Sequence, residues 1–142
     1  MGAVEPRVSD AIPTRWVTQI RGQLADADRR MGLADRRATE GDGGRALQEA
    51  YPGVMAAALA KVWLADESWH RTRTMQEYGQ MVRAELPSGF ATLGELTADA
   101  RGFSGWRVED ARPLLEEARA FIGAVHADLD RRLRPPPAET KP

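Results

Sequence analysis

Apolar residues recur every three or four positions along most of this 142-residue chain, which is the periodicity of amphipathic α-helices. No stretch alternates between apolar and polar residues for long enough to predict a strand. The pattern divides the chain into five helical segments, at residues 14–31, 45–65, 68–86, 91–100 and 110–134. It therefore predicts an all-α fold, an antiparallel bundle of four to five helices.

Turn and capping residues predict where these helices begin and end. We expect Thr14 to cap the first helix, and the polar, glycine-containing segment 32–44 to form a loop. Pro52 predicts a kink in the second helix or a helix start. Asp110 is the expected N-cap of the last helix, with Pro113 in its first turn.

The same pattern divides the chain into one domain and two tails. We expect residues 1–13 to be a flexible N-terminal tail, residues 14–134 to be the helical bundle, and residues 135–142 to be a disordered, proline-rich tail. The apolar stripes also predict a set of residues that are buried together, namely Val54, Ala58, Val62, Leu115, Ala118, Ile122 and Val125.

Composition narrows the classes of function. Lys and Arg total 20 and Asp and Glu total 21, so the net charge of −1 argues against a generic nucleic-acid coat. Cysteine is absent, which excludes disulfides, thiol nucleophiles and thiolate metal sites. The N-terminus does not read as a secretory signal, and the longest apolar stretch, residues 54–65, is too short to span a bilayer. We expect a cytoplasmic protein without membrane contact, and the predominance of Arg over Lys suggests a GC-rich bacterial genome.

A metal site is the first chemistry to consider, because Glu67 and His70 form a Glu-x-x-His pair. Carboxylate-bridged di-metal bundles need this motif twice. The other histidine, His126, has Gly123 at the corresponding position, so the second half is missing. We therefore expect no metal site and no cofactor.

The run that begins at His70 offers a second possibility. His70, Arg71 and Arg73 are close in sequence and follow Trp69, so together they suggest a small phosphate-binding patch with a ring available for stacking. The alternative, which we favour, is the solvated first turn of a helix.

A third group lies in the last helix. Arg119 and His126 are seven residues apart, which places both on one face beside the apolar stripe, and Arg112 lies seven residues before Arg119. Asp130 follows His126 by four residues and is in position to orient its imidazole. This line suggests a cleft between two bundles, and hence a homodimer. The alternative is that these residues form ordinary surface pairs.

The order of these features resembles the HEPN superfamily of small helical bundles. Residues 16–27 resemble the first HEPN helix, and residues 41–51 with 54–61 resemble the second, which often carries an Ala-Tyr and then an alanine-rich turn. Residues 101–106 are similar to the step before the last HEPN helix, and residues 107–121 are similar to that helix. The resemblance covers most of residues 14–133.

The resemblance implies two alternative functions. Many HEPN proteins are metal-independent endoribonucleases with an Arg-x(4–6)-His motif across a dimer cleft, which Arg119 and His126 match at its upper spacing. In that case Arg119 holds the phosphate and His126 handles the proton of the 2′-hydroxyl. Other members are non-catalytic and bind a partner protein, nucleotide or RNA, often in toxin or defence systems. Ala120 stands where the nucleases usually have a polar residue, so we favour the non-catalytic function.

Overall fold

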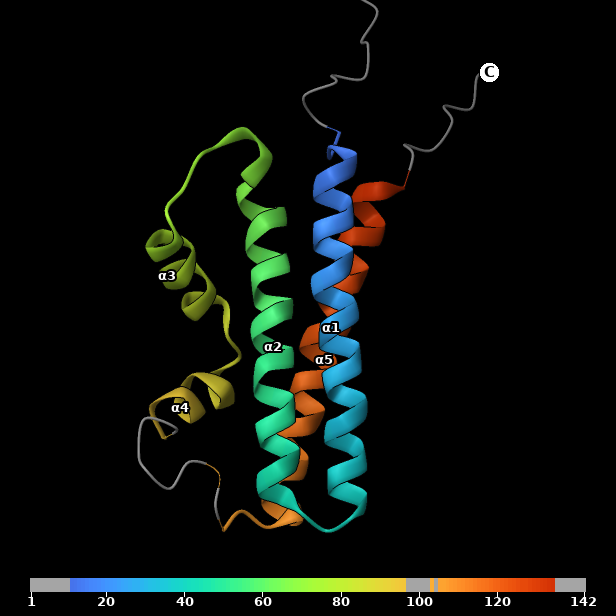
Figure 1. Cartoon of the computed structure of the whole chain (residues 1–142), viewed down its shortest axis with the longest axis vertical. Coiled ribbons are helices and arrows are strands. Elements are labelled where there is room, and N and C mark those ends of the chain that lie inside the picture. The colour runs from blue at the N-terminus through green and yellow to red at the C-terminus, as the bar shows by residue number, and fades with distance from the viewer. Residues whose placement is uncertain (1–10, 97–102, 104, 135–142) are drawn as a thin grey trace, which may run out of the picture.

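The computed structural model of the chain describes residues 11–96, 103 and 105–134, and the described residues are helical with no strand (Figure 1). Three predicted segments lie partly or wholly outside the described residues: residues 1–10 of the tail predicted at 1–13, the tail predicted at 135–142, and the end of the short helix expected at 91–100. The helices are α1 (Thr14–Thr39), α2 (Gly43–Asp66), the short 3₁₀ helix η2 (Ser68–His70), α3 (Met75–Glu85), α4 (Ser88–Leu96) and α5 (Val108–Leu133). The predicted all-α bundle is confirmed.

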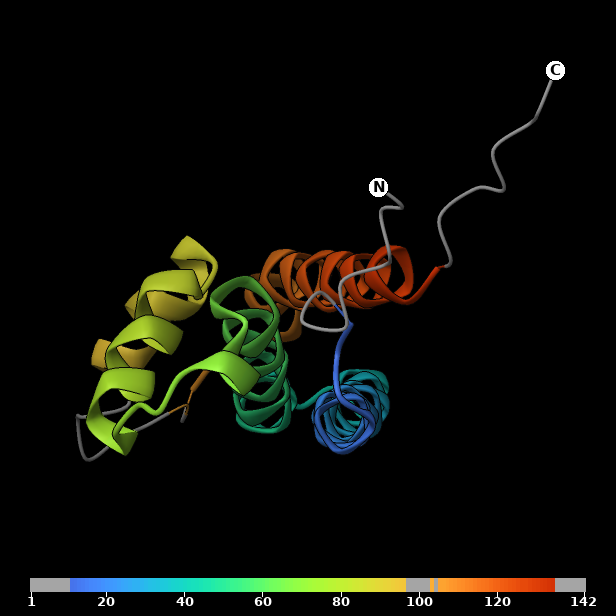
Figure 2. The same ribbon diagram turned by 90° about the horizontal axis from the view of Figure 1, so that it is seen from above.

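Three long helices, α1, α2 and α5, form the body of the molecule, and α3 and α4 lie on the opposite side of α2 from α1 (Figures 1 and 2). The helix α1 runs antiparallel to α2 and α5, as expected. In contrast, α2 and α5 run parallel, because the segment that carries α3 and α4 returns the chain to the end where α2 began.

The predicted burial is confirmed, but the residues lie in two clusters rather than together. All seven predicted residues are buried. The larger cluster joins α1, α2 and α5, and its members include Val54, Leu115 and Ile122. Ala58 and Val62 instead face α3 and pack with Val82. Because α2 lies between the other helices, it is apolar nearly all round.

The end of α1 and the start of α2 differ from the predicted loop at 32–44. The helix α1 continues to Thr39 because Met31 and Ala34 extend its buried stripe. Two glycines of this segment, Gly43 and Gly44, are closely packed at the start of α2. A Cβ at Gly43 would lie 2.5 Å from the carbonyl oxygen of Arg107, so only glycine fits there without displacement. Asp42 caps α2 by accepting a hydrogen bond from the Arg45 amide.

The predicted helix at 68–86 is interrupted. Glu67 adopts a left-handed conformation with φ of 50°, η2 follows, and α3 begins only at Met75. Thr74 caps α3 through a capping box with Glu77, which fixes the start of the helix. Pro87 precedes α4, which begins at Ser88 and so three residues earlier than expected.

The predicted caps Thr14 and Asp110 and the alternative of a helix start at Pro52 are wrong. Pro13, and not Thr14, is the N-cap of α1. Pro52 lies inside a continuous α2. The helix α5 begins at Val108, three residues after Gly105, so Asp110 lies in the first turn, where a carboxylate is favourable.

Candidate functional site

The predicted catalytic pair lies along the contact between α5 and α1. The Arg119 guanidinium forms an ion pair with Asp35, and the His126 Nε2 lies 3.1 Å from each carboxylate oxygen of Asp28. Each acidic residue is on α1, seven residues from the other, and each basic residue is on α5, also seven residues apart. The seven-residue spacing on α1 therefore equals that on α5, and each basic side chain has a carboxylate opposite it. We call these two pairs the α1–α5 seam.

The geometry of the seam directs Arg119 and His126 to different partners. Two residues seven apart are separated by about 10 Å along a helix axis. Arg119 and His126 both extend across to α1, where their carboxylate partners are separated by a similar distance. A general base must come within hydrogen-bond reach, about 3 Å, of the proton that it removes. The seam therefore holds the two side chains side by side, each on its own partner, rather than converging on one reacting group.

The seam pairs are partly exposed, which limits their energies. The side chains of Arg119 and Asp35 are 48% and 46% exposed, and those of His126 and Asp28 are 42% and 56% exposed. Ion pairs at such positions typically contribute about 0.2–1 kcal/mol. The seam thus sets the register of α1 against α5 more than it determines the overall stability.

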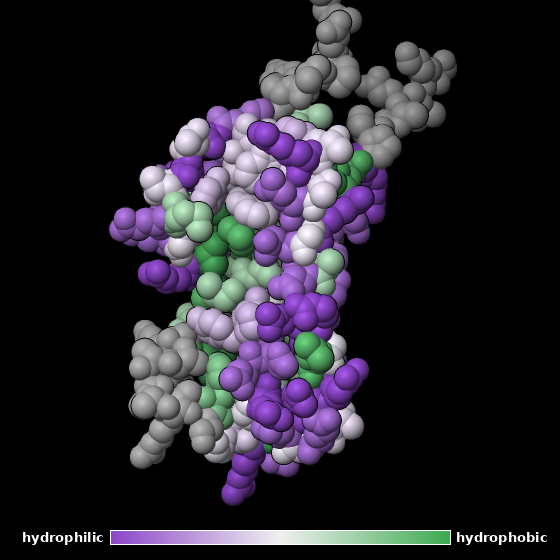
Figure 3. Space-filling view, viewed as in Figure 1, coloured by the Kyte–Doolittle hydropathy of each residue, from purple (hydrophilic) through white to green (hydrophobic). Residues whose placement is uncertain are grey.

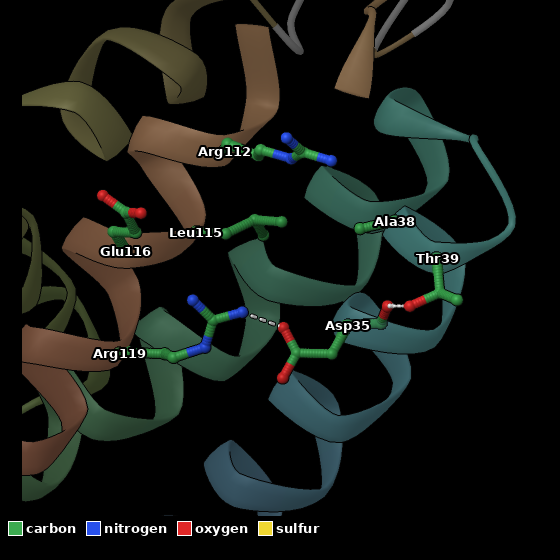
Figure 4. A pocket seen from close by; sticks show the side chains of 7 residues that line it. All are labelled: Asp35, Ala38, Thr39, Arg112, Leu115, Glu116 and Arg119. Atoms are coloured by element: carbon green, nitrogen blue, oxygen red, sulfur yellow. Dashed lines mark hydrogen bonds and ion pairs between the residues drawn. The ribbon is translucent and has the colours of Figure 1, made fainter. Parts of the chain in front are cut away.

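A shallow pocket of about 340 Å³ lies at one end of the seam, and Figure 4 shows the side chains around it. Arg112 and Arg119 line it from α5 and Asp35 lines it from α1, and in this view Leu115 and Ala38 lie between Arg112 and the Arg119–Asp35 pair. The Arg119–Asp35 ion pair crosses its lower side. Arg112 has no ion-pair partner among the described residues. The predicted line of Arg112, Arg119 and His126 is therefore present, but it faces α1 of its own chain.

Asp130 was predicted to orient the His126 imidazole, but another residue makes that contact. The carboxylate that contacts the His126 imidazole belongs to Asp28, 98 residues away in sequence. Asp130 is exposed on α5, and its backbone carbonyl accepts a hydrogen bond from the Arg134 amide. The i to i+4 spacing suggested a local partner, whereas the antiparallel packing supplies a distant one.

In the predicted phosphate patch at 70–73, the Arg73 guanidinium is already paired with a carboxylate. Arg73 donates two hydrogen bonds of 2.7 Å to the two oxygens of Asp66, and Arg71 lies 4.0 Å from the same carboxylate. These contacts, chiefly the hydrogen bonds from Arg73, hold the pKa of Asp66 below its ordinary value of 3.8. The Asp66 side chain is only 6% exposed, so this group anchors the link between α2 and α3.

His70 is exposed beside an aromatic cluster that sequence reasoning missed. Its ring lies 5.8 Å from that of Trp69, which in turn lies 6.4 Å from Trp16. Trp16 makes an edge-to-face contact with Trp63 at 5.4 Å, and the Arg132 guanidinium lies over Trp69. The cluster joins α1, α2, η2 and α5 at one end of the bundle. No sequence signal connects Trp16 and Arg132 with the segment 63–70, because they are far from it along the chain.

A second feature that sequence reasoning missed is an apolar groove between α1, α2 and α3. It has a volume of about 350 Å³, and hydrophobic side chains gather there on the face shown in Figure 3. We call it the α3 groove, and it is lined by Gln23, Asp26, Pro52, Met55, Ala56, Leu59, Met75, Tyr78, Gly79 and Val82. The helical spacing of Met75, Tyr78 and Val82 was the available signal, but it indicated burial in a continuous helix rather than a groove wall.

Comparisons with known proteins do not identify a family for this chain. No family model, curated protein or solved structure matches the chain. Within residues 11–96, 103 and 105–134, no three His, Cys, Asp or Glu side chains are grouped so that they could hold a metal ion. No helix in the same part of the chain has the length and apolar character needed to cross a membrane.

Proposed function

We propose that this chain is a non-catalytic, HEPN-like helical module that binds a partner protein. The α1–α5 seam is the observation that carries the proposal. Arg119 and His126 each contact a carboxylate of their own chain, so their spacing is explained by helix packing without any reaction. A bacterial, cytoplasmic setting of the toxin or defence type accompanies the proposal through the resemblance to HEPN proteins.

A protein fits the chemistry of the surface better than RNA does. The charge balance gives no excess of cations to release counterions from a polyanion. Arg73 and Arg119, two of the cations suggested for phosphate binding, pair with Asp66 and Asp35. The α3 groove, in contrast, offers apolar side chains to a partner, which is the character of the buried centre of protein interfaces.

A ribonuclease assay in the presence of EDTA tests the non-catalytic assignment. The wild type, Arg119→Ala and His126→Ala are incubated with a structured RNA, and the Arg119→Ala/His126→Ala double variant, purified in the same way, serves as the blank. We expect the rate for the wild type to equal that of the blank. A wild-type rate above the blank, lost by orders of magnitude in both single variants, would overturn the proposal and establish a metal-independent endoribonuclease.

A further inference from the structure

The α3 groove combines a recess with a projecting apolar side chain. Its floor is formed by α2, with Met55 and Leu59 half-buried, and its walls are formed by α1 and α3. Met75, on the α3 wall, is 87% exposed, and it is the only large hydrophobic side chain so exposed among the described residues. Burying a side chain of this size typically contributes about 1.5–3 kcal/mol, so the surface favours an occupant that covers it.

The charge of the groove limits what that occupant can be. Among the described residues, Asp26 is the one charged residue that lines the groove, and its carboxylate lies 2.5 Å from Arg29 and 4.0 Å from Arg30. The groove therefore presents no unpaired charge to attract a basic peptide, an acidic peptide or a nucleic acid. Its best complement is another neutral surface with a projecting apolar side chain.

The chain itself has such a surface, because the recess and Met75 are parts of the same patch. A two-fold axis brings each patch against its own copy, so a projection beside a recess is self-complementary. We propose that the α3 groove is the contact surface between two copies of this chain, with Met75 of each copy inserted in the groove of the other. This inference rests on the proposed function, since it names the first protein that the module binds.

The size of the patch sets the expected strength of the dimer. The helix α3 has 11 residues and is therefore about 16 Å long. A contact centred on one such helix is small beside standard interfaces, which bury about 1,200–2,000 Å² in total, and smaller contacts are typically weak. We expect a concentration-dependent dimer with micromolar affinity. Since the surface is apolar and neutral, added salt should not weaken it.

Sedimentation equilibrium over protein concentrations from about 1 to about 300 μM, the range for an interface of this size, tests the proposal. We expect the wild-type mass to rise from 15.6 kDa toward twice that value. Met75→Glu should remain at 15.6 kDa throughout, while Gln76→Glu, the matched control, should associate as the wild type does. Both substitutions add one carboxylate to the first turn of α3, where it is tolerated, so both variants should keep the wild-type circular dichroism spectrum.

Three results would overturn the proposal: a wild type that stays monomeric, a Met75→Glu variant that dimerises normally, or masses that grow beyond the dimer. Dimerisation that salt weakens would also contradict it, because salt dependence would indicate a contact through charged side chains such as the α5 rim. These outcomes are independent of the ribonuclease assay. Failure of the dimer leaves the non-catalytic assignment standing, and a ribonuclease activity leaves the dimer surface standing.

Discussion

Replacing Arg73 with alanine tests how the link between α2 and α3 is held. Asp66 accepts two 2.7 Å hydrogen bonds from Arg73, and its side chain is 6% exposed. After the substitution, the carboxylate keeps the Ser68 hydroxyl at 3.3 Å and Arg71 at 4.0 Å. Leaving a buried acceptor without its main donors costs about 1–3 kcal/mol, and more when it is charged. We therefore expect Arg73→Ala to lower the free energy of unfolding by about 1–3 kcal/mol.

The effect should depend on pH in a defined direction. The pKa of Asp66 is lowered in the folded protein, so the pair stabilises the fold fully above the unfolded pKa of about 4. This stabilisation is lost as the pH falls through the lower folded pKa. The difference between the wild type and Arg73→Ala should therefore be greatest near neutral pH and should shrink in acid, below about pH 4.

Urea unfolding followed by circular dichroism at neutral and acid pH measures both effects. Arg71→Ala is the matched control, because Arg71 is 60% exposed and only 4.0 Å from Asp66, and it should cost less than about 0.5 kcal/mol. The reasoning is refuted if Arg73→Ala costs no more than Arg71→Ala, or if its cost is the same at both pH values.

Three further stability predictions are measured by the same urea unfolding at neutral pH. Gly43→Ala should destabilise by about 1–3 kcal/mol because its Cβ would lie 2.5 Å from the Arg107 carbonyl oxygen, whereas Gly22→Ala, in open space, should not; equal effects would refute the close contact. Ile122→Ala should cost about 2–5 kcal/mol because Ile122 is buried in the main cluster, and a cost below about 1 kcal/mol would contradict that packing. Thr74→Ala removes the cap of α3 and should cost about 1 kcal/mol, while an unchanged stability would show that the capping box does not fix the helix.

The helical fold could be predicted because burial and helical period agree along most of the chain. The stripe of α5, for example, places Leu115, Ile122 and Val125 in the core as expected. The ends of the helices were harder to predict, because they depend on packing against other helices. Met31 and Ala34 extend α1 through a segment whose composition indicated a loop, because α2 and α5 cover them.

The sequence indicated where the candidate site residues lie but not which residues they contact. The heptad spacing of Arg119 and His126 correctly placed both beside the apolar stripe, but it could not indicate that Asp35 and Asp28 lie opposite. The sequence also could not predict that α2 and α5 run parallel, because this depends on the path of the segment between them. The α3 groove could be found only in the structure, because its floor and its two walls come from three separate helices.

A double-mutant cycle on the α1–α5 seam tests directly whether Asp35 holds Arg119 in its structural role. Asp35→Ala, Arg119→Ala and the double variant are compared with the wild type by urea unfolding at low salt. We expect a coupling of about 0.2–1 kcal/mol that disappears near 1 M salt, and we expect the swapped pair Asp35→Arg/Arg119→Asp to recover stability lost by Arg119→Asp alone. Additive single effects at low salt, with no recovery by the swap, would show that Arg119 is not held by Asp35 and would contradict the structural role assigned to it.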